Sequence, residues 1–317
     1  MKKIVCIVIL LTLIFSMLSG CDSKESIQSS TDKLSIVTTI YPYYEFAKNI
    51  TEDKAEIKLL LSPGAEPHDY EPSPSDIVAI EKCDIFIYNG GESDEWVEGI
   101  LKSLDNKKVN AIRMMDYVEP ICAESHHHEE NENHNEHEEH AHEFDEHIWT
   151  SVINAKKIVK AICELTQSCD KDNAKHYYLN SQQYIEQLSA LDAKFDSIIN
   201  SSNQKYIVVG DRFPLRYFAN DYGIDYVSAF SGCNSETQPG IATVIHLIDF
   251  VRENDIPVVI YLDFSSDNIA KLISEDSDAK VRKMWSCHNV TKEEFENKES
   301  YISLMNKNAK ILEEALS

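Results

Sequence analysis

The sequence has few basic residues for its length. Lys and Arg together number 30 of 317 residues, against 54 Asp and Glu, which gives a formal net charge of −24 at pH 7. Nucleic acids and anionic lipid headgroups are bound through positive charge, so this composition argues against both as partners. Two patterns of hydrolytic enzymes, the H-E-x-x-H zinc motif and the G-x-S-x-G nucleophile elbow, are also absent. The sequence therefore supports neither nucleic-acid binding nor these two kinds of catalysis.

The N-terminus lacks an apolar run long enough to span a membrane. An apolar stretch, interrupted only by Thr12, covers residues 4–15, which is shorter than the ~18 residues that a spanning helix needs. Two lysines precede it, and a run of small residues ends at Cys21, an order typical of an export signal. Small residues leading into a cysteine resemble the lipobox of bacterial lipoproteins. We therefore expect a signal peptide over residues 1–20, a lipid on Cys21, a flexible tether over residues 21–33, and a place on the extracytoplasmic face of the cell membrane.

Glycine and proline are absent from residues 172–200. Apolar side chains recur there at helical spacing, namely Tyr178, Leu179, Ile185, Leu188, Leu191 and Phe195. The pattern predicts one helix of about 28 residues, which would be about 40 Å long at 1.5 Å per residue. An unbroken helix of this length would restrict hinge motion between the parts that it joins.

Short apolar strands alternate with helices on both sides of this segment. Before it, we expect strands at residues 34–39, 55–61 and 84–88, and helices at residues 43–50, 75–82, 96–104 and 151–166. After it, we expect strands at residues 206–209, 225–230, 257–263 and 280–284, and helices at residues 215–222, 241–254, 268–275 and 301–316.

This alternation predicts an α/β fold with two lobes, each a mainly parallel sheet flanked by helices, joined by one long rigid helix. The N-terminal lobe would cover residues 34–170, the linking helix residues 171–202 and the C-terminal lobe residues 203–317. Parallel sheets bind ligands at the carboxyl ends of their strands, so we expect the functional site in the interlobe cleft.

A histidine-rich, acidic segment covers residues 124–146, with almost nothing apolar in it. Its histidines are His126, His127, His128, His134, His137, His140 and His142. Such a segment cannot bury enough apolar surface to order itself, so we expect a mobile, solvated loop. Imidazole is a common ligand of transition metals, and neighbouring carboxylates raise the local cation concentration. We interpret the segment as a loop that recruits metal; the alternative is a charge run that only keeps the surface soluble.

Two further histidines stand at positions that suit an ordered metal site. His68 lies in residues 62–76, directly after a predicted strand, and four prolines stiffen this segment. Ser75 is expected to cap the helix that follows. His147 comes after the histidine-rich segment, behind two acidic residues and ahead of Trp149. Carboxylates placed in this way can fix the tautomer of a metal-binding imidazole.

Two segments, PGAEPHDYEPSPSD from Pro63 to Asp76 and DEHIW from Asp145 to Trp149, carry a resemblance to a known family. They resemble the signature regions of the metal-binding lipoproteins of bacterial ABC importers, the ZnuA/TroA-like solute-binding family, whose second motif usually reads D-P-H-x-W. The resemblance covers the whole mature chain, and a histidine-rich loop just before the second motif is similar to that of zinc-specific members.

The resemblance implies a non-enzymatic, monomeric binding protein that captures Zn²⁺ outside the cell and delivers it to an ABC permease. In this family four side chains hold the metal between two lobes, and two of them match His68 and His147. Three imidazoles with one carboxylate suit zinc, whereas manganese sites carry more oxygen. The alternatives are a manganese-specific member of the family, a metal-dependent adhesin or other surface protein, and a zinc hydrolase.

The second half of the chain departs from the family pattern. The family usually has a histidine in H-x-A-F-G-Y, whereas the segment from Gly210 to Tyr217 has none. Asp211 is then the expected ligand, since carboxylate oxygen binds zinc at about 2.0–2.2 Å; alternatively it caps a helix or pairs with a nearby arginine. His288 is expected in place of the family's final Asp or Glu, and Glu236 and Asp263 are alternative oxygen ligands.

Cys233 and Cys287 each follow a predicted strand. In an exported protein a thiol pair at one site would tend to oxidise, so we expect a disulfide that braces the site. Zinc ligation by one thiolate is the alternative.

Overall fold

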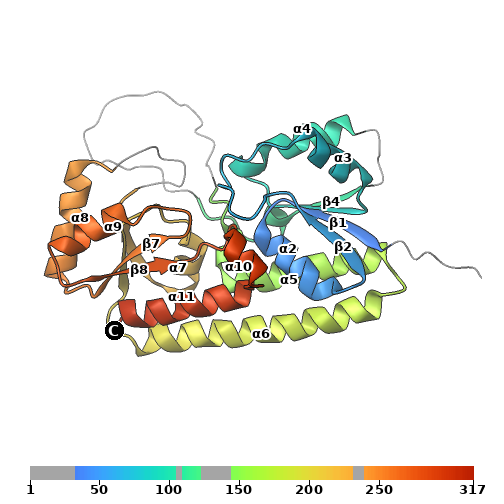
Figure 1. The fold of residues 1–317 in the computed structure, drawn as a ribbon. Helices are drawn as coiled ribbons and strands as arrows, with labels where there is room; N and C mark the ends of the chain where they lie inside the picture. Colours follow the sequence, from blue (N-terminus) through green and yellow to red (C-terminus); the bar gives the residue numbers. More distant parts are fainter. Residues whose placement is uncertain (1–32, 105–108, 123–143, 231–238) are drawn as a thin grey trace, which may run out of the picture. The chain divides into compact units, whose positions relative to one another are not determined.

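The computed structural model describes residues 33–104, 109–122, 144–230 and 239–317 (Figure 1). The folded body comprises Leu34–Ser317. Several predictions concern residues outside the described parts of the chain, namely the signal peptide, the lipidated Cys21, the tether before residue 33, the seven loop histidines, Glu236 and Cys233. None of the described helices is long and apolar enough to cross a membrane.

The first half of the body contains four parallel strands in the order β2-β1-β3-β4. They are β1 (Leu34–Thr38), β2 (Ala55–Leu59), β3 (Ile85–Tyr88) and β4 (Asn110–Arg113). The helices beside them are α2 (Tyr41–Thr51), α3 (Pro74–Lys82), α4 (Glu95–Ser103) and α5 (Val152–Cys169). Alternate strand residues point to opposite faces of the sheet. Ile36 and Ile85 therefore pack with α2 and α5, whereas Val37 and Phe86 pack with α3 and α4 on the other face (Figure 1).

The second half repeats this plan with strands in the order β6-β5-β7-β8, again all parallel. The strands are β5 (Tyr206–Val209), β6 (Asp225–Ser228), β7 (Val258–Leu262) and β8 (Lys280–Met284). The helices are α7 (Arg216–Tyr222), α8 (Ile241–Glu253), α9 (Asn268–Glu275), the short α10 (Lys292–Glu296) and α11 (Tyr301–Ala315). Val208 and Val259 face α8 and α9, while Ile207 and Ile260 face the opposite side, toward α11. The predicted fold class, two lobes of parallel sheet flanked by helices, is confirmed.

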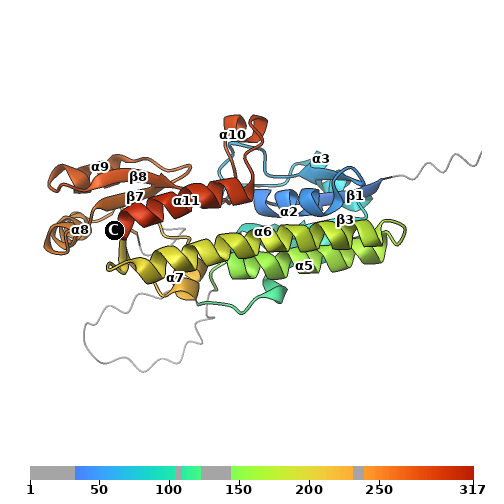
Figure 2. The ribbon, with the colours of Figure 1, turned by 90° about the horizontal axis from the view of Figure 1, so that it is seen from below.

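The long helix is α6 (Ala174–Ser201), which has 28 residues. It packs against α2 and α5 of the first half and against α7 and α11 of the second (Figure 2). Its buried stripe is Tyr177, Ser181, Tyr184, Leu188, Leu191, Phe195, Ile198 and Ile199. The predicted stripe was therefore wrong at its start, since Tyr178 and Leu179 are 51% and 55% exposed. The register is set by Tyr177 and Ser181, which keep helical spacing with Leu188.

Two elements and one cap differ from the sequence prediction. The edge strand β4 and the short helix α10 were not predicted, because their sequences NAIR and KEEFE carry almost no apolar pattern. The N-cap of α3 is Ser73 and not Ser75: the Ser73 side chain accepts a hydrogen bond from the Asp76 backbone, and the Asp76 side chain bonds back to the Ser73 backbone. Pro74 at the first helical position explains this shift, since proline suits that position and needs no donor there.

Candidate metal centre

His68 lies in the segment after β2, at the carboxyl end of the first sheet. Asn289, a fully buried residue of the second half of the chain, holds this segment in place. Its side-chain Nδ2 donates to the carbonyls of Ser62 and Ala65, at 2.9 Å in each case. The prolines restrict the backbone of the segment, and Asn289 fixes its start against the loop that follows β8.

His147 directly precedes the short 3₁₀ helix Ile148–Thr150 and is 2% exposed. Its backbone N and its ring Nδ1 lie 2.8 and 3.0 Å from Asp145 Oδ1. The other oxygen of Asp145 lies 3.8 Å from Arg216 Nε of α7, and the Tyr217 hydroxyl donates to the Asp145 carbonyl at 3.0 Å. Asp145 therefore holds Nδ1 of His147, which leaves Nε2 as the nitrogen available to a metal.

His288 comes from the loop after β8 and is 4% exposed. Its backbone N donates to Ser286 Oγ at 3.2 Å, and its carbonyl accepts from the Tyr41 backbone of α2 at 3.4 Å. Its ring lies against Trp149, with 4.5 Å between ring centroids. Trp149 Nε1 in turn donates to the Ser286 carbonyl at 2.9 Å. Although this loop belongs to the second half of the chain, its contacts fix it to the first.

The three imidazoles converge on one point. One ligand nitrogen from each of His68, His147 and His288 lies within 4.8 Å of the others, and the ring centroids are 5.3–5.7 Å apart. In a tetrahedral zinc site with Zn–N bonds of 2.0–2.1 Å, neighbouring nitrogens lie about 3.4 Å apart. Modest side-chain rotation is enough to bring the three nitrogens onto one ion, so these residues fit a divalent transition metal.

Burial and neighbouring groups shift the pKa values of the side chains at the site. Burial and the neighbouring His147 lower the pKa of His68, against the opposing effect of Glu146. Burial, His147 and His68 hold the pKa of His288 well below its ordinary value. Burial alone would raise the pKa of Asp145, but His147 and Arg216 outweigh it and lower that pKa. At neutral pH a metal therefore meets uncharged imidazoles at His68 and His288 and has few protons to displace there.

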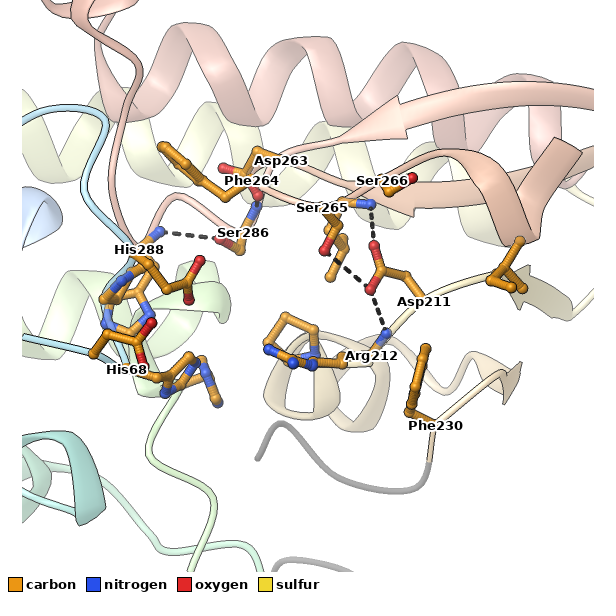
Figure 3. A pocket seen from close by; sticks show the side chains of 18 of the residues that line it. His68, Asp211, Arg212, Phe230, Asp263, Phe264, Ser265, Ser266, Ser286 and His288 are labelled. Atoms are coloured by element: carbon orange, nitrogen blue, oxygen red, sulfur yellow. Dashed lines mark hydrogen bonds between the residues drawn. The ribbon is translucent and has the colours of Figure 1, made fainter. Parts of the chain in front are cut away.

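The histidines line a cavity of about 690 Å³. Asp211, at the end of β5, lies across this cavity from His68 and His288 (Figure 3). Its Oδ1 accepts hydrogen bonds from the Arg212 backbone at 2.7 Å and from Ser265 Oγ at 3.1 Å. Its Oδ2 accepts from the Leu262 backbone at 3.1 Å. Asp211 is thus part of the cavity wall and bonds to the loop after β7.

Asp263, at the end of β7, also lines the cavity. Its Oδ1 accepts from the Ser286 backbone at 2.8 Å, and burial raises the pKa of the Asp263 carboxyl to about 7. Its Oδ2 has no hydrogen-bond partner in the part of the chain that the structure describes. A buried carboxyl oxygen without a partner is costly, and it lies beside the loop that carries His288.

The predicted ligands therefore divide into two sets. His68, His147 and His288 form the cluster, while Asp211 and Asp263 line the same cavity without belonging to it. Ligation by either carboxylate stays a prediction. Glu236, Cys233 and the loop histidines lie outside the described residues. Cys287 is buried and forms no disulfide with another described cysteine. Its disulfide with Cys233 stays a prediction.

Sequence reasoning missed the role of Glu146, because it assigned both acidic residues before His147 to that histidine. Glu146 Oε1 instead lies 3.5 Å from Nδ1 of His68. Ser93, in the turn after β3, contacts both side chains: its Oγ is 2.5 Å from Glu146 Oε1 and 3.2 Å from His68 Nδ1. No sequence signal marks Ser93. It follows β3 and His68 follows β2, and their loops meet because both strands lie next to β1 in the sheet.

Comparison with known proteins gives consistent matches along the chain. The family described as "ZnuA: Zinc-uptake complex component A periplasmic" matches residues 36–315. The high-affinity zinc uptake system protein ZnuA of Bacillus subtilis is 32% identical over 308 residues, which cover 95% of this chain and 94% of that protein. The zinc-binding lipoprotein AdcA of Streptococcus pneumoniae is 32% identical over 314 residues, which cover 99% of this chain but 61% of AdcA.

A solved structure shows the same architecture. The Zn(II)-bound ZnuA-like domain of Streptococcus pneumoniae AdcA superposes with a TM-score of 0.74 at 30% identity, and the match covers 90% of this chain and 99% of that domain. The chain thus spans about three-fifths of AdcA but nearly the whole of its ZnuA-like domain.

Proposed function

This chain belongs to the ZnuA family of periplasmic zinc-uptake components, and we propose that it captures a divalent transition metal, foremost Zn²⁺, outside the cell and delivers it to an ABC permease. Family membership makes the chain a solute-binding protein rather than an enzyme. The observation that carries the proposal is the convergence of three imidazoles from three separate loops, of which those of His147 and His288 are buried and that of His68 is half-buried. The proposal includes a monomer anchored by a lipid on Cys21, and the lipoprotein name of AdcA supports the anchor.

The ligand chemistry favours zinc over manganese. Imidazole nitrogen suits zinc, copper and nickel, whereas manganese prefers carboxylate and water oxygen. The three histidines present nitrogen, and Asp145 is engaged with His147, so oxygen at the ion would come from one carboxylate of the second sheet. A manganese-specific site would need more oxygen at the ion than this arrangement supplies.

For the fourth ligand we propose Asp211, with Asp263 as the alternative. Asp211 would have to exchange its bonds to Leu262 and Ser265 for the metal. Asp263 would have to bring its unpartnered Oδ2 to the ion, and binding would displace the proton that its raised pKa favours. Both carboxylates come from the second sheet, so ligation by either would join the second half of the body to the histidine cluster.

The test is zinc titration of residues 22–317 against a competing chromophoric chelator. The variant His68→Ala/His147→Ala/His288→Ala should lose the single tight site, because it removes all three imidazoles that converge there. The matched control is His176→Ala/His246→Ala, which removes the other two described histidines and should bind zinc as the unmodified protein does. Unchanged tight binding by the triple variant would refute the site.

The same titration identifies the fourth ligand and the metal. Asp211→Asn should weaken zinc binding at least tenfold, while Asp263→Asn should change it less than threefold. The reverse pattern would move the fourth ligand to Asp263. Tighter binding of manganese than of zinc by the unmodified protein would favour the manganese-specific alternative.

A further inference from the structure

We propose that Glu146 is a positioning residue that acts on His68 through Ser93, and that this relay sets how tightly the metal is held. The inference rests on the proposed function, because it concerns the same three-histidine site. Glu146 stands at the position where the family motif D-P-H-x-W usually has proline. This chain therefore has a carboxylate at a position where the motif has none.

The relay is defined by three short contacts. Ser93 Oγ donates to Glu146 Oε1 at 2.5 Å, and the Ser93 backbone N donates to Glu146 Oε2 at 2.9 Å. The same Ser93 Oγ lies 3.2 Å from Nδ1 of His68. Because the single hydroxyl proton of Ser93 goes to the carboxylate, its oxygen is left to accept the Nδ1 proton of His68. The geometry therefore places the His68 proton on Nδ1 and the free lone pair on Nε2.

The loop after β3 is built around this carboxylate. Glu146 is 7% exposed, and the Asn89 side chain donates to its carbonyl at 2.9 Å. Gly91 has a φ of +87°, and a Cβ there would lie 2.7 Å from both Cβ and Oε2 of Glu146. Both the positive φ and the lack of room for a Cβ require glycine at position 91. The protein thus encloses a carboxylate next to His68 instead of leaving it in solvent.

Each of two ligand histidines thereby has its own carboxylate from one tripeptide, Asp145-Glu146-His147. Asp145 bonds His147 directly, and Glu146 reaches His68 through a hydroxyl. A carboxylate behind a ligand imidazole fixes its ring and raises its basicity, and loss of such a partner commonly weakens metal binding 10–100-fold. The alternative is that Glu146 only shapes the loop by accepting the Ser93 backbone N.

The first experiment reads the His68 tautomer in the metal-free protein by long-range ¹H–¹⁵N correlation NMR, with His68→Ala to assign the signals. The unmodified protein should show the Nδ1–H tautomer, and Ser93→Ala should shift the population toward Nε2–H. An Nε2–H tautomer in the unmodified protein would overturn the relay. Because no metal is present, this result is independent of the proposed function.

The second experiment is a double-mutant cycle on zinc affinity with Glu146→Gln, which keeps the shape and an acceptor for the Ser93 backbone but removes the charge. Glu146→Gln should weaken zinc binding 10–100-fold in the presence of His68 and less than threefold in the His68→Ala background. Equal losses in both backgrounds would mean that Glu146 acts only as a general negative charge, and no loss in either would mean that it acts only on the loop. Both results overturn the proposal.

The matched control is Asp69→Asn, which removes an exposed carboxylate next to His68 that lines the same cavity. Solvent screens an exposed charge, so its effect on zinc affinity should stay below threefold. A loss equal to that of Glu146→Gln would overturn the special role of Glu146. Failure of the unmodified protein to bind zinc tightly would instead contradict the proposed function.

Discussion

At the scale of single residues, the metal centre depends on where each carboxylate directs its oxygens. Asp145 and Glu146 are adjacent in sequence yet contact different histidines. Asp211 and Asp263 line the cavity, but at least one oxygen of each is bonded to backbone NH groups. The acidic composition alone does not distinguish these roles, because a carboxylate that holds a histidine and one that caps a backbone NH are the same residue type.

Asp76, the last residue of the first motif, allows a pH-dependent prediction. Its Oδ1 accepts from Lys58 Nζ at 2.7 Å, and its Oδ2 accepts from the Ser73 backbone at 3.1 Å. Burial opposes ionisation, but Lys58 and Ser73 outweigh it and lower the pKa of Asp76 to about 2, from 3.8. The stability that this carboxylate contributes is therefore present above pH 3.8 and is lost as the pH falls through about 2.

We expect Asp76→Asn to lower the free energy of unfolding by about 1–2 kcal/mol at pH 7, by the same amount at pH 5, and by progressively less below pH 4. Urea unfolding of the metal-free proteins at these pH values measures the effect. The control Asp53→Asn removes a 77% exposed carboxylate beside Lys54 and should change stability by less than about 0.5 kcal/mol. A cost for Asp76→Asn that is as large at pH 3 as at pH 7 would contradict the charge-based explanation.

At the scale of elements, the site is built from loops at the carboxyl ends of parallel strands. The loop after β2 carries His68 and the loop after β8 carries His288. Two links join these loops: the bonds from Asn289 to Ser62 and Ala65, and a bond from the Gly64 backbone to the Val290 carbonyl at 2.8 Å. Loops from the two sheets are thus fixed to each other by contacts within the protein.

Replacement of Asn289 by alanine tests this link. Asn289→Ala removes both donors and leaves two carbonyls without their partner, which should cost about 2–4 kcal/mol of unfolding free energy. Because His68 and His288 then lose their fixed separation, zinc affinity should fall at least tenfold. Urea unfolding and chelator competition measure the two effects.

The control is Asn254→Ala, whose side chain bonds only within its own helix end, to the Phe250 carbonyl. It should leave zinc affinity unchanged. A destabilised Asn289→Ala protein that still bound zinc with full affinity would show that the link serves folding alone.

At the scale of the whole molecule, we expect the folded body to hold metal tightly and the histidine-rich segment to bind it weakly. One apolar core runs from the first sheet along α6 to the second sheet. The histidine-rich segment adjoins that body where Cys122 and Phe144 pair as an antiparallel bridge. The ends of the segment are therefore adjacent, and it can be shortened without pulling on the body.

We expect replacement of residues 124–143 by two glycines to leave the tight zinc site intact and to remove weaker, additional zinc binding. The reason is that His68, His147 and His288 all belong to the folded body. Calorimetric titration with zinc resolves the two classes of site. A control in which the seven loop histidines become glutamine at full loop length should give the same result. Loss of the tight site in either variant would show that the segment supplies a ligand to it.

The sequence by itself determined the fold class, the position of most strands and helices, and the three clustered histidines. Hydrophobic periodicity reports directly on which residues are buried, and the segment PGAEPHDYEPSPSD is specific enough to identify His68. The tertiary structure alone decided the start of the buried stripe on α6, the edge strand β4, and the partners of each carboxylate. These depend on which strands are neighbours and on which loops then meet. The strand order β2-β1-β3 brings Ser93 to His68, and Glu146 reaches the same histidine from the segment before Ile148–Thr150. Contacts between residues so far apart in sequence leave no local pattern.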